Sequence, residues 1–239
     1  MNLGQAIVEA LESVSSNKLR SALTILGIVI GVGAVIAMLA VGNGAQETIT
    51  GSISGIGSNL LFVFRGNQTT ELSHVEPLTM DDANALLDQF QAPSIDKVAP
   101  IISENGKISF GGESTTTSIT GVTASYAAVR NFKVSEGEFI TDDQDLGRAS
   151  VVVIGVDVAD KLFDRRDGLV GETIRIEGQP FRIIGVLESK GGGSFGSEDN
   201  VVMVPFSTAQ ARLIRRSRNN VDTIFVSVLK PELMTQAKD

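Results

Sequence analysis

The residue types that most often carry catalysis or bind metals are scarce in this chain of 239 residues. It has no cysteine and a single histidine, His74, which lies in a polar stretch between Ser73 and Glu76. Without cysteine there are no thiolate metal sites, no cysteine nucleophiles and no disulfides. One histidine cannot build a histidine metal cluster, and it gives a serine–histidine relay almost nothing to work with. We therefore predict no catalytic site, no metal site and no bound cofactor.

Two local patterns resemble binding motifs but depart from them. Asp142, Asp143 and Asp145 cluster, yet they lack the alternating carboxylates, turn glycine and terminal glutamate of a calcium loop. The glycine-rich GGGSFG at residues 191–196 lacks the lysine and hydroxyl residue with which a phosphate-binding loop ends. We interpret the first as a solvated turn and the second as a flexible loop.

Charge excludes one large class of partners. The formal net charge is −8, which argues against nucleic acid, because its phosphates require clustered lysine and arginine. One basic cluster exists near the end of the chain, and a solvated face is the first interpretation, with a patch for an acidic partner as the alternative. Its members are Arg212, Arg215, Arg216 and Arg218.

We predict a membrane helix at residues 21–42, and this helix would anchor the rest of the chain. This stretch has no charged side chain, and about 20 apolar residues span the hydrocarbon core as a helix. The alternative is a cleaved signal peptide, but its apolar region is usually only about 7–15 residues long. Lys18 and Arg20 flank the stretch on one side, whereas Gln46 and Glu47 follow it. The bias of positive charge to the cytoplasm therefore predicts a cytoplasmic N-terminus and an extracytoplasmic remainder in the cell membrane.

Small residues are spaced to let a second helix approach this span. Gly27 and Gly31 form a G-x-x-x-G pattern, and Gly33 and Ala37 continue the run of small residues. In membranes such a ridge permits close backbone packing, although glycine is also common in membrane helices generally. We predict a helix–helix contact on this face.

The first 20 residues are predicted to form a short cytoplasmic amphipathic helix. Apolar residues recur there at spacings of three and four. They are Leu3, Ala6, Ile7, Ala10, Leu11 and Val14. A helix leading into a span lies at the membrane surface, and it either contacts another protein or serves only as a run-in to the span.

Residues 43–239 are predicted to form an extracytoplasmic α+β domain. Runs of β-branched and aromatic residues predict strands, for example at residues 59–65, 150–154 and 223–228. Paired glycines at residues 111–112 predict a hairpin in a β-rich middle region, which we interpret as an inserted subdomain. Irregular alternation of helices and strands favours α+β over a doubly wound parallel sheet.

Several motifs in order resemble the N-terminal half of MacB-like (FtsX-superfamily) ABC transporter permeases. NKLRSALTILGIVIG at residues 17–31 resembles the first membrane helix of that family, and AVGNGA at 40–45 resembles its exit from the membrane. Further residues resemble the core domain of that family. They are Gly121, Tyr126, Arg130 and Gly137, followed by VVIG at 152–155 and IIGVL at 183–187. Each motif is weak alone, whereas their order and spacing over nearly the whole chain are specific.

The resemblance implies a function without a catalytic site in this chain. It implies a permease subunit, with ATP hydrolysis on a separate ABC ATPase subunit and three further membrane helices beyond Asp239. It also implies a homodimer or paired permease, and a mechanism in which ATP-driven movement of membrane helices shifts the outer domain for export or extraction of substrate. The sensor domain of a signalling receptor is the alternative, and an anchored extracytoplasmic enzyme is a third reading.

Overall fold

The computed structural model contains two units, Met1–Gly51 and Ser52–Asp239, which are treated separately below. The structure describes the following residues: 4–5, 18–56, 59–66, 77–88, 90, 92–193, 196–214 and 219–238. The predicted amphipathic helix at residues 1–20 lies almost wholly outside this set, as do His74 and three of the four clustered arginines.

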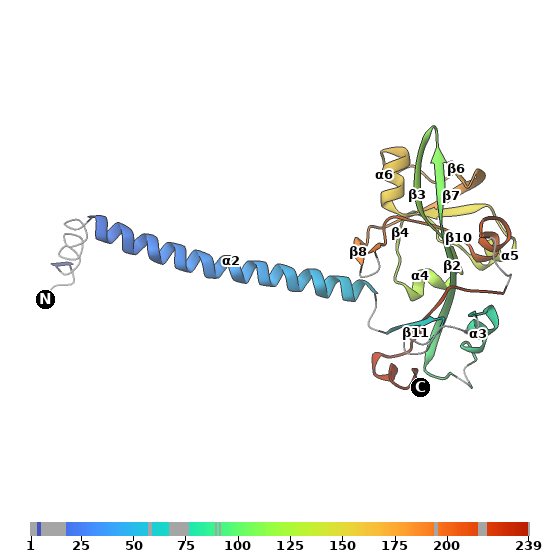
Figure 1. Ribbon diagram of the computed structural model, residues 1–239, viewed down its shortest axis with the longest axis horizontal. Coiled ribbons are helices and arrows are strands. Elements are labelled where there is room, and N and C mark those ends of the chain that lie inside the picture. Colours follow the sequence, from blue (N-terminus) through green and yellow to red (C-terminus); the bar gives the residue numbers. More distant parts are fainter. Residues whose placement is uncertain are drawn as a thin grey trace. The chain divides into compact units, whose positions relative to one another are not determined.

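The longest helix of the chain, α2, spans Lys18–Ile56 and contains the predicted membrane span (Figure 1). The apolar run has no proline and many residues that form helices readily, so nothing in it interrupts the hydrogen-bond ladder. The helix continues past the span through Gly51 and Gly55, although glycine in a helix interior is less favourable than alanine.

The domain in residues 52–239 is a mixed α+β fold built on one large sheet, which confirms the predicted class. Its strands are β1 (Leu60–Phe64), β2 (Ile95–Phe110), β3 (Glu113–Val122), β4 (Val134–Gly137), β5 (Val151–Ile154), β6 (Thr173–Ile176), β7 (Gln179–Leu187), β10 (Val201–Pro205) and β11 (Thr223–Val228). A separate small hairpin is made of β8 (Gly192–Gly193) and β9 (Gly196–Ser197). The helices are α3 (Met80–Ala85), α4 (Ser125–Val129), α5 (Asp142–Leu146), α6 (Val156–Phe163) and α7 (Phe206–Thr208), followed by a π-helix at Ala209–Leu213 and a 3₁₀-helix at Pro231–Leu233.

Six of these strands close into a barrel. The pairing runs β2–β3–β10–β5–β7–β6, and β6 pairs back with β2 through Ile176 and Ile108. Closure satisfies the edges that an open sheet would leave unpaired. The strands β11 and β1 extend the sheet from β2, and β4 extends it from β7.

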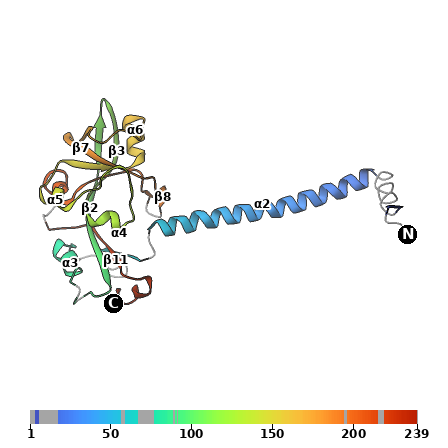
Figure 2. The same cartoon turned by 180° about the vertical axis from the view of Figure 1, so that it is seen from behind.

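Alternation along the strands divides the apolar residues into two cores. Val152 and Ile154 of β5 belong to the first core with the barrel interior, whereas Val151 and Val153 belong to the second. The helix α6 adds apolar side chains to the first core, and α4 covers the second with Tyr126. Figure 2 shows β2 and β3 as long neighbouring strands near α4. This two-sided burial follows from the period-two geometry of a strand.

The predicted β-hairpin exists, but it is longer than expected and is part of the main sheet. The apolar runs at residues 97–102 and 107–110 predict two separate strands, whereas β2 runs unbroken from Ile95 to Phe110. Its first part pairs with β11, and its residues from Ile101 onward pair with β3. The polar stretch between the two apolar segments continues the ladder, and Gly106 leaves room for Ile119 and Glu177. The region expected as an inserted subdomain therefore shares strands with its surroundings.

Candidate functional site

The apolar part of α2 has the length and composition of a membrane span. It covers Lys18–Gly42, 25 residues with a mean hydropathy of 2.7. At about 1.5 Å per residue this exceeds the roughly 30 Å of a hydrocarbon core. Lys18 and Arg20 lie in its first turn. Their role in setting orientation remains a prediction, because the structure contains no membrane.

The predicted helix-packing face is open in the structure. A Cβ atom built on Gly27, Gly31 or Gly33 would meet no atom within 4 Å. Gly31 lines a hollow of about 410 Å³ with four apolar side chains, those of Ile28, Val32, Val35 and Ile36. Ala37 lies in the same helix. These residues lie on an exposed helix surface, and the expected contact at Gly27, Gly31, Gly33 and Ala37 stays a prediction.

The first and last strands of the folded domain lie side by side. The incoming strand β1 and the outgoing strand β11 are antiparallel neighbours, with Leu60 opposite Ser227. One rung beyond this pair, the Val228 N–H donates to the Asn59 carbonyl at 2.8 Å. The Asn59 side-chain amide donates to the Val228 carbonyl at 2.7 Å. Two hydrogen bonds therefore join Asn59, the residue before β1, to Val228, the last residue of β11.

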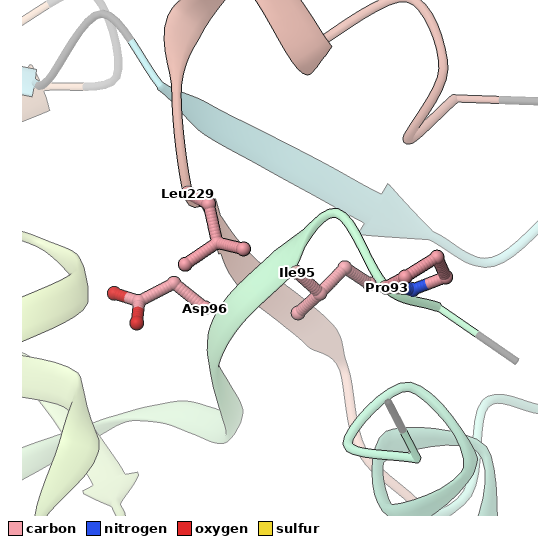
Figure 3. Close-up of a pocket in the computed structure, with 4 residues that line it drawn as sticks. All are labelled: Pro93, Ile95, Asp96 and Leu229. Atoms are coloured by element: carbon pink, nitrogen blue, oxygen red, sulfur yellow. The ribbon is translucent and has the colours of Figure 1, made fainter. Parts of the chain in front are cut away.

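The outgoing strand is also held to the start of β2. The Leu229 N–H donates to the Ser94 carbonyl at 3.0 Å, and a bulge lies at Ser227 and Val228. A hollow of about 250 Å³ is lined there by Pro93, Ile95, Asp96 and Leu229. Figure 3 shows the Leu229 side chain beside the first residues of β2, near Asp96 and Ile95. The C-terminal end of β11 is thus hydrogen-bonded on one side to Asn59 and on the other side to Ser94.

Three charged side chains are buried together under the second core. Arg130, at the end of α4, donates to Glu198 Oε1 at 2.7 Å, and Lys190 Nζ lies 2.8 Å from Glu198 Oε2. All three side chains are at most 13% exposed. Aromatic rings cover the cations, because the Arg130 guanidinium lies 4.7 Å from the Phe225 ring centroid and Lys190 Nζ lies 4.2 Å from that of Phe132. Arg130, Lys190 and Glu198 are called the buried charge trio below.

The buried charge trio and Asp199 together fix the base of the glycine-rich loop. Asp199 accepts hydrogen bonds from the Lys190 and Gly191 N–H groups at 2.7 and 3.0 Å. It also accepts from the Ser189 hydroxyl at 2.7 Å. Lys190 Nζ donates to the Arg130 carbonyl at 2.8 Å. At its base, the loop predicted to be flexible is therefore fixed by charge-assisted hydrogen bonds, which are among the stronger ones in proteins.

A cavity of about 310 Å³ lies beside the trio. Its wall is mixed, with apolar side chains such as Phe132, Met203 and Phe225 and hydroxyls such as Ser103 and Thr120. Arg130 and Glu198 are the charged residues in the wall. Because the two form an ion pair, the wall has little net charge, and nothing in it converges on a reacting atom.

Tyr126 in this wall has a strongly shifted acidity. Burial raises the pKa of Tyr126 from 10.0 to about 12, while the charge of Arg130 lowers it and that of Glu198 raises it. The neutral phenol is therefore favoured in the folded domain. Unfolded chains release this proton from about pH 10, so the stability contributed by the neutral phenol is complete below pH 10 and is lost between pH 10 and about 12. The difference between the two pKa values corresponds to a loss of about 3 kcal/mol in the free energy of unfolding.

We predict that the phenol of Tyr126 titrates near pH 12. It is the single tyrosine, and the chain has no tryptophan, so near-ultraviolet phenolate absorbance reports this group alone. Tyr126→Phe should abolish the signal and flatten the loss of stability between pH 10 and 12. A titration midpoint near pH 10 in a chain whose circular dichroism is still native would contradict the prediction.

The patterns noted in the sequence have structural roles. Thr141 caps α5 by accepting from the Gln144 N–H, and Asp142, Asp143 and Asp145 occupy that helix's first turn. Asp145 accepts a hydrogen bond from the Ser207 N–H at 2.7 Å. Within the described ranges no group of acidic, histidine or cysteine side chains is arranged to hold a metal. The expected solvated turn is a short capped helix, and one of its carboxylates fixes the start of α7.

Sequence reasoning missed the buried charge trio. Arg130 was noted only as part of a family motif, while Lys190 and Glu198 bracket the glycine-rich loop. The partners are 60 and 68 residues apart along the chain. No spacing rule relates such residues, so three-dimensional structure was needed to find them.

Comparison with known proteins gives one consistent match. A sequence profile described as the MacB-like periplasmic core domain matches residues 21–239. A macrolide export ATP-binding/permease protein MacB from Hyphomonas neptunium is 36% identical over 218 residues, which is 90% of this chain and 33% of that protein. A pyoverdine export ATP-binding/permease protein PvdT from Pseudomonas syringae pv. tomato is 34% identical over 198 residues, covering 82% and 30% of the two chains. This chain thus spans about a third of the length of these curated relatives.

Solved structures agree on the fold. The periplasmic region of MacB from Actinobacillus actinomycetemcomitans superposes with a TM-score of 0.63 at 25% identity, covering 77% of this chain and 83% of that one. The extracellular domain of the noncanonic ABC-type transporter YknZ from Gram-positive bacteria gives a TM-score of 0.61 at 20% identity, covering 75% and 88%.

Proposed function

This chain belongs to the family of the MacB-like periplasmic core domain, and from that premise we propose that it is part of the permease of an ABC exporter. In this proposal α2 crosses the cell membrane with its N-terminus in the cytoplasm, and the α+β domain lies outside. ATP hydrolysis in the cytoplasm moves the membrane helices, and the outer domain moves with them. Substrate need not pass through the domain.

The observation that carries this proposal is the junction of β1 and β11. A domain inserted between two membrane helices must receive and return the chain on one side, and here Leu60 and Ser227 are neighbours. The chain reaches Leu60 only four residues after α2 ends at Ile56. Movement of α2 therefore arrives at the sheet through a very short connection.

The rest of the domain suits a part that moves as one body. Its barrel is closed, its two cores share β5, β7 and β10, and the buried charge trio fixes the loop that leads into β10. Among the described residues nothing resembles an arrangement of nucleophile, base and electrophile. The related proteins are named as exporters, which supports transport over the sensor alternative.

We propose that the ATPase is a separate subunit and that the permease is paired, as a homodimer or with a second permease. The relatives named above are each called an ATP-binding/permease protein, so their names join both functions in one protein. Purification of the full-length protein from its native host separates these cases. An ATPase chain of separate mass that copurifies, with hydrolysis dependent on both chains, is the expected result. Purification without any ATPase would contradict the transporter proposal.

Orientation is tested with single cysteines, because the chain has none of its own. We expect Glu113→Cys, at the exposed turn between β2 and β3, to react with an impermeant maleimide in intact cells. The matched control Gln5→Cys should react only after lysis. The reverse pattern would show that the proposed orientation is wrong.

A further inference from the structure

Asn59 occupies the point where any force that passes along the chain from α2 first meets the sheet. The helix α2 ends at Ile56 and β1 begins at Leu60, so Asn59 is the last residue before the incoming strand. Within the described residues β1 pairs with β11, whereas β11 pairs with both β1 and β2. The backbone of the incoming strand is therefore hydrogen-bonded to the sheet through its ladder with β11, while Leu60 packs into the second core.

The geometry of this ladder concentrates a load on its first rung. Force enters β1 at its N-terminal end, and the chain leaves β11 at its C-terminal end, which lies opposite. Separation of these two ends opens an antiparallel pair like a zipper, one rung after another. The rung closest to the load must break before the next one is loaded, so it sets the resistance of the whole pair.

An unusual donor completes that first rung. In a regular antiparallel pair both hydrogen bonds of a rung come from the main chain. Here the Val228 N–H donates to the Asn59 carbonyl at 2.8 Å, while the donor to the Val228 carbonyl is the Asn59 side-chain amide at 2.7 Å. A residue without a side-chain donor at this position would leave the Val228 carbonyl without this bond.

We propose that Asn59 is a positioning residue that locks the incoming strand to the outgoing strand, so that the outer domain follows the movement of the membrane helix. The lock consists of the Asn59–Val228 rung, and it is reinforced behind β11 by the bond from the Leu229 N–H to the Ser94 carbonyl at 3.0 Å. The inference rests on the proposed function only for the origin of the force.

The lock is tested by pulling on the full chain in detergent. Ser52→Cys and Gln236→Cys provide handles on either side of the β1–β11 pair, and no native cysteine competes. Loss of one hydrogen bond should raise the opening rate at constant force about fivefold in Asn59→Ala, equivalent to about 1 kcal/mol. Asn59→Asp should open faster still, because a carboxylate would face the Val228 carbonyl without a proton to share.

A matched control is available in the same domain. Asn219 also donates its side-chain amide, to Asp81 at 2.8 Å, but on the exposed surface away from this rung. Asn219→Ala should leave the opening rate unchanged. Equal opening rates in the wild type, Asn59→Ala and Asn219→Ala would overturn the inference.

A second measurement needs no force. Amide hydrogen exchange at Val228 should accelerate about fivefold in Asn59→Ala, while exchange in β5 and β7 stays the same. Exchange that accelerates equally throughout the sheet would indicate general destabilisation and would overturn a local lock.

The two proposals fail in distinguishable ways. If Asn59→Ala shows the pulling and exchange effects but no ATPase is associated with the full-length protein, the lock stands and the transporter proposal fails. If an ATPase is present and Asn59→Ala behaves as the wild type in both measurements, the lock fails. In the intact transporter the lock further predicts that Asn59→Ala retains ATP hydrolysis but shows a smaller ATP-driven movement of a spin label at Glu113→Cys than the same label shows with Asn59 present.

Discussion

Glu198→Ala is expected to lower the free energy of unfolding of the domain by about 3–5 kcal/mol. Glu198 is the anion that both Arg130 and Lys190 contact, at 2.7 and 2.8 Å. Its removal leaves two cations with little access to water, and the Arg130 side chain is only 6% exposed. Uncompensated buried charge is among the few causes of so large a loss. Urea unfolding followed by circular dichroism measures the change.

The chain supplies its own control for this experiment. Arg165 and Glu172 form an ion pair at 3.5 Å with side chains 50% and 40% exposed. Exposed pairs of this kind contribute about 0–1 kcal/mol, so Glu172→Ala should be nearly neutral. Equal effects of the two substitutions would mean that water in the adjacent cavity solvates Arg130 and Lys190, and that the trio does not hold the loop.

The free-energy cost of breaking the buried charge trio bears on the movement that we propose for this domain. Buried ion pairs are weak contributors to net stability compared with apolar packing, but breaking one is costly. The Arg130–Glu198–Lys190 contacts therefore favour one position of the base of the glycine-rich loop. In the proposed function this contact would help the domain to move as one body.

The sequence was sufficient for the fold class and for most strands. Runs of β-branched and aromatic residues predicted β5 and β11, and the paired glycines at 111–112 predicted the turn after β2. Closure of the barrel was not predictable, because it depends on Ile108 pairing with Ile176. A period-two pattern identifies a strand and its buried face, but it does not identify the partner strand.

Two errors show how tertiary contacts override local pattern. The apolar residues Ala83, Leu86 and Phe90 predict a helix that reaches about Phe90, yet α3 ends at Ala85. Ala83 and Leu86 pack against the first core, whereas Phe90 is 99% exposed. The last predicted turn has no surface to pack on, and packing supplies most of the stability of short helices. Conversely, β4 was missed because VSEG at residues 134–137 has little strand character. Pairing with β7 makes it a strand.

The site could be predicted only in part. The span and its glycines follow from composition, and Lys18–Gly42 is the helix found. The Asn59 rung and the buried charge trio depend on contacts between residues far apart in the chain, such as Asn59 with Val228. Such contacts produce no periodic pattern in the sequence, although Arg130 is one of the residues that resemble the family.

Gly137, one of the glycines that resemble the family, occupies a position where only glycine fits. Gly137 in β4 pairs with Gly185 in β7, and its backbone has φ +80. A Cβ atom on Gly137 would lie 2.0 Å from the Ile184 carbonyl oxygen, and one on Gly185 would lie 2.3 Å from the Glu138 carbonyl oxygen. The two strands approach so closely that neither position accepts a side chain.

Gly137→Ala is therefore expected to destabilise the domain by about 4 kcal/mol, through a left-handed backbone costing about 1–2 kcal/mol and a clash that must displace a strand. Gly178→Ala isolates the first of these effects, because Gly178 has φ +79 but no atom within 4 Å of a built Cβ. It should cost only about 1–2 kcal/mol. Thermal unfolding of both variants measures the difference, which represents the close approach of β4 and β7. Equal losses in the two variants would mean that β4 can shift away from β7 at little cost. This edge of the sheet would then not belong to the part that we propose to move as one body.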